Sequence, residues 1–208
     1  MWRWVLVAAL LGGGCHARFQ SRVDDIRGVR VRVGDVMAPH VRLGIGGTTG
    51  SVTEAALGAL QVGRSVAHTR TLQRKTSKRA IADALRDRLR DRRTRYRALA
   101  PPPNGRPDSS LLVDVLWMRV AESSGARPTE VRMRVRSTLT HDQQRIYRGV
   151  TRCRAPFISA RRTLYADAGT AIEDARPKEL QAWMEGAARA CADQVLTRLG
   201  AHGRLDGR

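Results

Sequence analysis

The amino-acid sequence predicts an α+β fold, a two-layer domain in which helices pack on one face of an antiparallel β-sheet. Two observations carry this prediction. Apolar and polar residues alternate through residues 130–140 and again through 145–153, which is the pattern of half-buried strands. Apolar residues recur every three or four positions between residues 177 and 200, which is the pattern of an amphipathic helix.

Two strands and two helices are expected in the first half of the domain. Short alternating segments at residues 27–33 and 40–45 predict a β-hairpin. Ser51 and Glu54 have the spacing of a capping box, which predicts a helix that begins at residue 52. Ser77 is suited to cap a second helix. That helix would cover residues 78–92 and bury one apolar face, made of Ile81, Ala84, Leu85 and Leu89.

The main sheet is expected to begin after a loop at residues 100–110, which contains three consecutive prolines. Residues 111–120 are apolar on both faces and predict a central strand with Trp117 in the core. The two alternating segments follow directly, so we expect an antiparallel meander of three strands. Residues 155–176 would form a long connection to the last helix.

The turn after residue 140 decides which arginines share a face of the sheet, because a shift of one residue moves every side chain to the other face. A three-residue turn pairs Thr140 with Gln144 and points Tyr147 and Cys153 into the core. A four-residue turn would instead place Arg145 on the basic face and Ile146 in the core. The first register predicts a candidate anion-binding face of Arg132, Arg134, Arg136, Arg148 and Arg152.

The last helix places Cys191 on its apolar stripe, so it can meet a core-facing Cys153. We expect a disulfide between them, which an oxidising compartment allows. Two buried free thiols are the alternative. The stripe itself consists of Leu180, Trp183, Met184, Ala187, Cys191, Val195 and Leu199.

The N-terminus has the pattern of a secretory signal: Arg3, a short apolar run and then three glycines. The run is too short to cross a bilayer, which needs roughly 20 apolar residues. Cys15 follows the glycines at once, and the stretch resembles the lipobox of bacterial lipoproteins, in which that cysteine is acylated, with palmitate among the chains. An ordinary signal cleavage nearby, for instance after Ala17, and a retained anchor are the alternatives. By the same resemblance, His16 favours the outer membrane over the inner membrane.

These observations give a simple organisation with one folded domain. We expect a signal peptide at residues 1–14, a lipid-anchored tether at 15–26, a single α+β domain at 27–200 and a flexible tail at 201–208. The protein would then lie on the periplasmic side of the cell envelope.

The chain is strongly basic, with a formal net charge of +19 over 208 residues. Such a balance indicates an anionic partner. Export excludes nucleic acid and leaves anionic lipid, lipopolysaccharide or an acidic envelope protein. A cytoplasmic nucleic-acid binder is the alternative if the chain is not exported. An arginine-rich surface that is merely solvated explains the same charge without any partner.

The sequence contains no recognisable catalytic, cofactor or metal motif. It lacks CxxC, its five histidines have no ligand spacing, and no GxSxG accompanies a serine, histidine and aspartate. We therefore expect no cofactor, no metal site and no enzymatic activity. An exported hydrolase whose catalytic residues come together only in the fold remains the alternative.

Several segments together resemble the small envelope lipoproteins of the lipopolysaccharide-assembly and transporter-auxiliary type. These are the lipobox-like start, the helix "TSKRAIADALRDRLRDRRTRYRAL", the strand "SSLLVDVLWMRV", the pair "EVRMRVRSTLT" and "RIYRGVTRC", and the C-terminal helix. The resemblance covers residues 77–200 and implies a membrane-anchored protein that binds an envelope partner and carries no catalytic residues.

Overall fold

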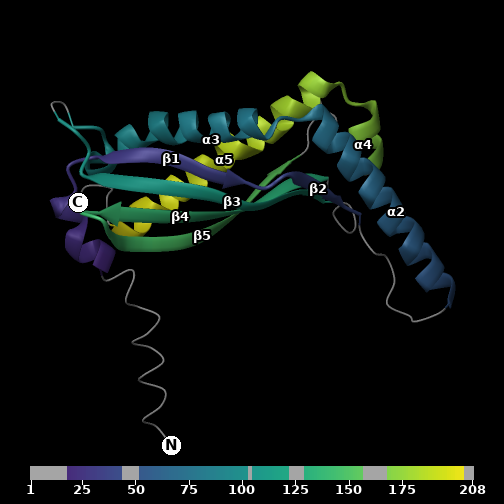
Figure 1. Cartoon of the computed structure of the whole chain (residues 1–208), viewed down its shortest axis with the longest axis horizontal. Coiled ribbons are helices and arrows are strands. Elements are labelled where there is room, and N and C mark those ends of the chain that lie inside the picture. The colour runs from purple at the N-terminus through teal and green to yellow at the C-terminus, as the bar shows by residue number, and fades with distance from the viewer. Residues whose placement is uncertain (1–17, 44–51, 103–104, 122–128, 157–167, 204–208) are drawn as a thin grey trace, which may run out of the picture.

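The computed structural model describes residues 18–43, 52–102, 105–121, 129–156 and 168–203 (Figure 1). Residues 1–17, with the expected signal peptide and Cys15, lie outside this part, as does Ser51 of the expected capping box. The strands are β1 (Val29–Val36), β2 (Pro39–Arg42), β3 (Ser109–Ala121), β4 (Glu130–His141) and β5 (Gln144–Pro156). The longer helices are α2 (Val52–Lys75), α3 (Lys78–Arg92), α4 (Ala168–Asp174) and α5 (Pro177–Gly203).

The predicted α+β class is confirmed, but the sheet is mixed rather than antiparallel. Its order is β1-β3-β4-β5, and β2 also pairs with β3. Both β1 and β2 run parallel to β3, the first beside Ser109–Val115 and the second beside Met118–Ala121. The expected β1–β2 hairpin is therefore wrong. Parallel strands need a long crossover connection, and α2 and α3 supply it between β2 and β3.

The expected meander of β3, β4 and β5 is present, with a different turn. Asp142 and Gln143, with φ angles of 46° and 64°, form a two-residue turn between the paired His141 and Gln144. This is the left-handed backbone of a tight hairpin. A bulge then adds Ile146 to β5, so that Leu139 lies opposite Tyr147. Because of this extra residue, Tyr147 and Cys153 lie on the core side of β5, as the expected three-residue turn would also have placed them.

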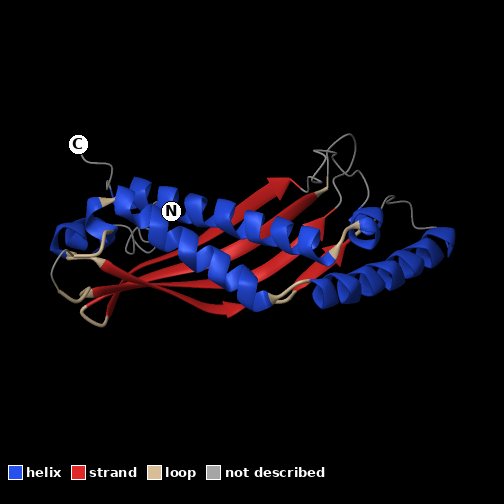
Figure 2. Ribbon diagram, turned by 90° about the horizontal axis from the view of Figure 1, so that it is seen from above, coloured by secondary structure: helices blue, strands red, loops and turns tan. Residues whose placement is uncertain are grey.

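Helices α3 and α5 lie side by side on one face of the sheet (Figures 1 and 2). Ser77 caps α3 by accepting a hydrogen bond from the amide of Ala80. The expected inner face of α3 is buried throughout. The stripe of α5 is buried as well, apart from the partly buried Trp183. Cys191 forms a disulfide with Cys153 of β5, with 5.3 Å between their Cα atoms, so the last helix is tied covalently to the sheet.

Two segments that were expected to be a tether and a loop contribute buried residues to the core. Residues 18–22 are helical and Phe19 is fully buried against Tyr147, with 5.4 Å between ring centroids. The second half of the expected tether is therefore part of the fold, because three apolar residues, Phe19, Val23 and Ile26, bury their side chains. The expected connection at 155–176 contains α4, whose Ala171 and Ile172 are fully buried. Helix α5 runs to Gly203, into the expected tail.

Helix α2 extends beyond the end of the sheet, where it contacts β2 and α4 (Figure 1). Its C-terminus is fixed by Leu72, which is fully buried, and by Lys75. Among the described helices, none is both long and apolar enough to cross a bilayer.

Candidate functional site

The face of the sheet opposite α3 and α5 carries arginines from every strand. We call it the open face. The side chains of β4 alternate strictly between the buried core and this face, so Arg132, Arg134 and Arg136 all lie on it. Neighbours in register complete the set. The open-face arginines are Arg30 and Arg32 of β1, Arg42 of β2, Arg119 of β3, Arg132, Arg134 and Arg136 of β4, and Arg148, Arg152 and Arg154 of β5.

The structure brings together all five arginines predicted from the sequence. Arg148 and Arg152 join the β4 arginines because the bulge at Ile146 gives β5 the required alternation. The predicted set did not include the open-face arginines of β1, β2 and β3, or Arg154 of β5. Their alternation with buried residues was visible, but their place on one surface depends on strand order, which a local pattern does not reveal.

Like charges lie directly opposite one another on this face. Arg134 pairs with Arg152, and Arg132 has Arg154 on one side and Arg119 on the other. Such pairs destabilise a sheet. Two carboxylates offset part of the repulsion. Glu130 forms an ion pair with Arg132, and Asp114 accepts hydrogen bonds from Arg136 Nε at 3.1 Å and from Nη2 at 2.8 Å.

Asp114 is the anchor of the open face, because its carboxylate is almost completely buried. The backbone of β1 comes close to it at Gly34, where an added Cβ would collide with Asp114 Oδ1. Glycine therefore leaves the space in which the carboxylate meets Arg136. This ion pair orients one arginine, whereas no ion pair is formed by the exposed Arg148, Arg152 or Arg154 within the part of the chain that the structure describes.

Trp117 lies on the open face, not in the core as expected. A bulge between Val115 and Trp117 shifts the alternation of β3, so Met118 takes the buried position and Trp117 faces Arg134. The guanidinium of Arg119 stacks over the indole at 4.6 Å from the ring centroid. This cation–π contact gives Arg119 a partner while leaving its charge available.

The positive charges of the open face act on one another. Burial lowers the pKa of Arg119, and the charges of Arg42 and Arg132 lower it further. Burial likewise lowers the pKa of His40, with the charges of Arg119 and Arg42 adding to the effect. His40 is therefore held neutral near pH 7, beside a cluster of cations that favours any anion placed among them.

A serine, a histidine and an aspartate meet at the start of β3. The Oγ of Ser109 lies 2.9 Å from His141 Nδ1 and 2.9 Å from Asp108 Oδ1. Asp108 also accepts the backbone amide of Arg27. Ser109 and His141 are both buried. The hydroxyl donates its single proton to the Asp108 carboxylate, so the cluster joins the start of β3, the end of β4 and the segment before β1.

No group of histidine, cysteine and acidic residues suited to a metal ion occurs among the described residues.

Comparison with known proteins identifies no family. No family model matches the sequence, and no curated protein matches it. Several solved structures show a distant similarity to the chain, among them the following three. A "putative lipoprotein" from Caulobacter crescentus is 14% identical, with a TM-score of 0.41, over 90% of this chain and 93% of that one.

A Xanthomonas campestris protein of family DUF330 is 16% identical, with a TM-score of 0.39, over 60% of this chain and 64% of that one. A hypothetical protein from Chlamydia trachomatis is 9% identical, with a TM-score of 0.39, over 85% of this chain and 98% of that one. The identities and TM-scores are low, so neither family membership nor function is transferred from these proteins.

Proposed function

We propose that this protein is a non-enzymatic, lipid-anchored lipoprotein of the bacterial cell envelope, whose open face binds an anionic envelope component. The lipobox-like sequence that ends at Cys15 supports the anchor. The arrangement of arginines on the open face supports the binding. Phosphate-bearing lipids and lipopolysaccharide are the components that fit best, because guanidinium groups bind phosphate oxygens in bidentate pairs.

The observation that carries this proposal is the repulsion that the open face sustains. Arginines lie directly opposite arginines on β3, β4 and β5, although alternating apolar and neutral residues would form the same sheet without that cost. A bound anion removes the repulsion. Strands spaced about 4.8 Å apart also let neighbouring guanidinium groups contact one or two phosphates at once.

The expected affinity of the open face for an anionic surface is large enough to measure. Attraction to an anionic surface contributes about 1 kcal/mol for each arginine that reaches it. The exposed arginines of β5 alone, Arg148, Arg152 and Arg154, therefore contribute about 3 kcal/mol, which is more than a hundredfold in affinity.

Charge reversal at the centre of the open face tests the proposal. The full chain with Cys15→Ala, which removes the acylation site, is mixed with phosphatidylglycerol vesicles and sedimented. Arg134→Glu with Arg152→Glu changes a directly opposed pair into carboxylates, and we expect at least a tenfold loss of binding. Binding should also weaken with added salt and vanish on phosphatidylcholine.

A matched control separates the open face from net charge. Arg79→Glu with Arg90→Glu makes the same charge change at two exposed positions of α3, on the helical side. We expect this variant to bind within threefold of the parent. Equal loss in both double variants, with circular dichroism showing intact folds, would contradict the assignment of binding to the open face.

A further inference from the structure

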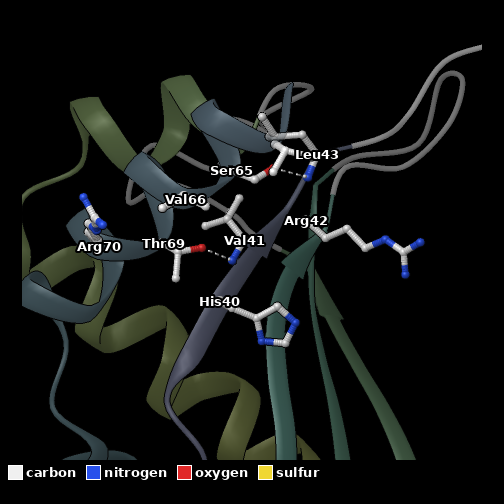
Figure 3. A pocket seen from close by; sticks show the side chains of 9 residues that line it. His40, Val41, Arg42, Leu43, Ser65, Val66, Thr69 and Arg70 are labelled. Atoms are coloured by element: carbon white, nitrogen blue, oxygen red, sulfur yellow. Dashed lines mark hydrogen bonds between the residues drawn. The ribbon is translucent and has the colours of Figure 1, made fainter. Parts of the chain in front are cut away.

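A groove of about 510 Å³ lies between β2 and α2, at the edge of the sheet (Figure 3). Its walls are mainly apolar and include Val41 of β2, Leu43 just after that strand, and Val62 and Val66 of α2. The volume lies within the range of about 300–1,000 Å³ that is usual for small-molecule sites. The groove is thus large enough for a ligand of moderate size.

The polar backbone of β2 is already satisfied inside the groove. The amide of Val41 donates to Thr69 Oγ1 at 2.9 Å, and the amide of Leu43 donates to Ser65 Oγ at 3.4 Å (Figure 3). One turn further along α2, Gln73 donates to the carbonyl of Pro39 at 3.0 Å. Helix α2 therefore occupies the edge that an added peptide strand would need. The remaining walls suit an occupant without hydrogen-bonding groups.

The apolar wall on α2 is open to solvent. Val62 is 60% exposed and Val66 is 45% exposed, which is unusual for side chains one turn apart beside a groove. Leu60 is exposed as well, at 65%, but it does not line the groove. Burial of an alkyl chain against Val62 and Val66 would remove this surface from water.

Cations stand at the rim of the groove. Arg70 lies on α2, one turn beyond Val66, and Arg42 extends from β2 on the side away from Thr69 (Figure 3). Arg42 also belongs to the open face, so the groove and the open face meet at β2. An occupant with an apolar chain and a negative headgroup satisfies both features.

We propose that the groove between β2 and α2 holds one acyl chain of an anionic lipid whose phosphate headgroup is bound at the rim by Arg42 or Arg70. This site rests on the proposed function, because Arg42 links it to the open face, and it names the ligand class as a phosphate-bearing lipid rather than an acidic protein.

A series of n-alkyl phosphates tests the site by titration calorimetry, with the full chain carrying Cys15→Ala. The probes have eight, ten and twelve carbons, each below its micelle concentration, and inorganic phosphate is the reference. Burial of each added methylene should tighten binding by roughly threefold to fourfold. Inorganic phosphate should bind far more weakly than dodecyl phosphate, which distinguishes a lipid from a free phosphate.

Two kinds of variant separate chain from headgroup. Val66→Asp should abolish the dependence on chain length. Leu60→Asp, which makes the same kind of change at an exposed position of the same helix outside the groove, should bind as the parent does. Arg42→Gln with Arg70→Gln should weaken every alkyl phosphate by a similar factor. Arg79→Gln, at an exposed position of α3 on the helical side of the sheet, should leave the affinities unchanged.

Two results would overturn the site. Dodecyl phosphate could bind no more tightly than inorganic phosphate, or Val66→Asp could retain the full dependence on chain length with an intact circular dichroism spectrum. Either result leaves the proposed function standing if the parent still sediments with phosphatidylglycerol vesicles. Loss of vesicle binding in the parent would instead remove the proposed function.

Discussion

Lys75 shows how a single side chain can hold an overhanging helix in place. Its ammonium group donates hydrogen bonds to the carbonyl oxygens of Ile172 at 2.9 Å, Glu173 at 3.1 Å and Ala175 at 3.0 Å. These carbonyls belong to the end of α4, where helical carbonyls lack partners and a cation is favourable. The C-terminus of α2 is thereby fastened to α4. Sequence patterns could not reveal this contact, because the two segments are about 100 residues apart.

Lys75→Met should lower the free energy of unfolding by about 1–3 kcal/mol, because three carbonyls at the end of α4 lose a charged donor. Urea denaturation followed by circular dichroism measures the change. Lys78→Met is the matched control, since Lys78 is exposed, and it should stay within about 0.5 kcal/mol of the parent. Equal effects of the two substitutions would show that the hydrogen bonds from Lys75 to these carbonyls do not stabilise the fold.

His40 makes the stability of the fold depend on pH. Burial and the charges of Arg119 and Arg42 lower its pKa below the ordinary value of 6.5. As the pH falls through about 6.5, the unfolded chain gains a proton at this residue before the folded chain does. The unfolded state then binds more protons, so the stability of the fold decreases toward acid.

His40→Gln should therefore reduce the loss of stability between about pH 7 and pH 5, because it removes a group whose pKa is lower in the folded chain than in the unfolded chain. Urea midpoints of parent and variant at pH 5, 6 and 7 measure the difference. The other ionisable groups are common to both proteins and cancel in the comparison. Parallel stability curves for parent and variant would show that His40 titrates normally.

At the scale of elements, the sequence predicted what depends on neighbours along the chain. The buried faces of α3, β4 and α5 were correct, because a helical or alternating pattern is written within one segment. The partners of β1 and β2 were wrong, because pairing depends on distant residues. The expected three-residue turn and the expected core position of Trp117 are wrong. Bulges at Ile146 and before Trp117 interrupt the alternation from which both were predicted.

In the candidate site, too, local sequence patterns predicted part of the arrangement, and the rest depends on residues far apart in the chain. The arginines of β4 could be placed on one face from alternation alone, whereas the contribution of β1, β2 and β3 required the strand order. The anchoring role of Asp114 was hidden as well, since it depends on the close approach of Gly34 from another strand. Single charged residues inside otherwise apolar strands are the signal that could have indicated it.

At the scale of the whole molecule, the fold separates two surfaces. Helices α3 and α5 cover one face of the sheet (Figures 1 and 2), and the register of the strands places the arginines on the other face. The net charge of +19 is thus concentrated partly on an open, extended surface. A lipid anchor near the N-terminus would hold that surface close to a membrane, where attraction between exposed charges is effective within a Debye length of about 8 Å.

Acylation of Cys15 is the expected link between this surface and the membrane. Metabolic labelling with an alkyne fatty acid should mark the parent protein, and Cys15→Ala should abolish the label because it removes the acceptor thiol. Cys191→Ala is a control, since Cys191 is fully buried in the disulfide and should not carry the label. Undiminished labelling of the Cys15→Ala variant would contradict the anchor.

Chemical modification can show directly which arginines contact an anionic membrane. Phenylglyoxal modifies accessible arginines, and mass spectrometry of the full chain with Cys15→Ala can compare each site with and without phosphatidylglycerol vesicles. We expect vesicles to protect Arg148, Arg152 and Arg154 on the open face, while Arg79 and Arg90 on α3 react as before. Protection of the α3 arginines with unchanged reactivity on β5 would contradict binding through the open face.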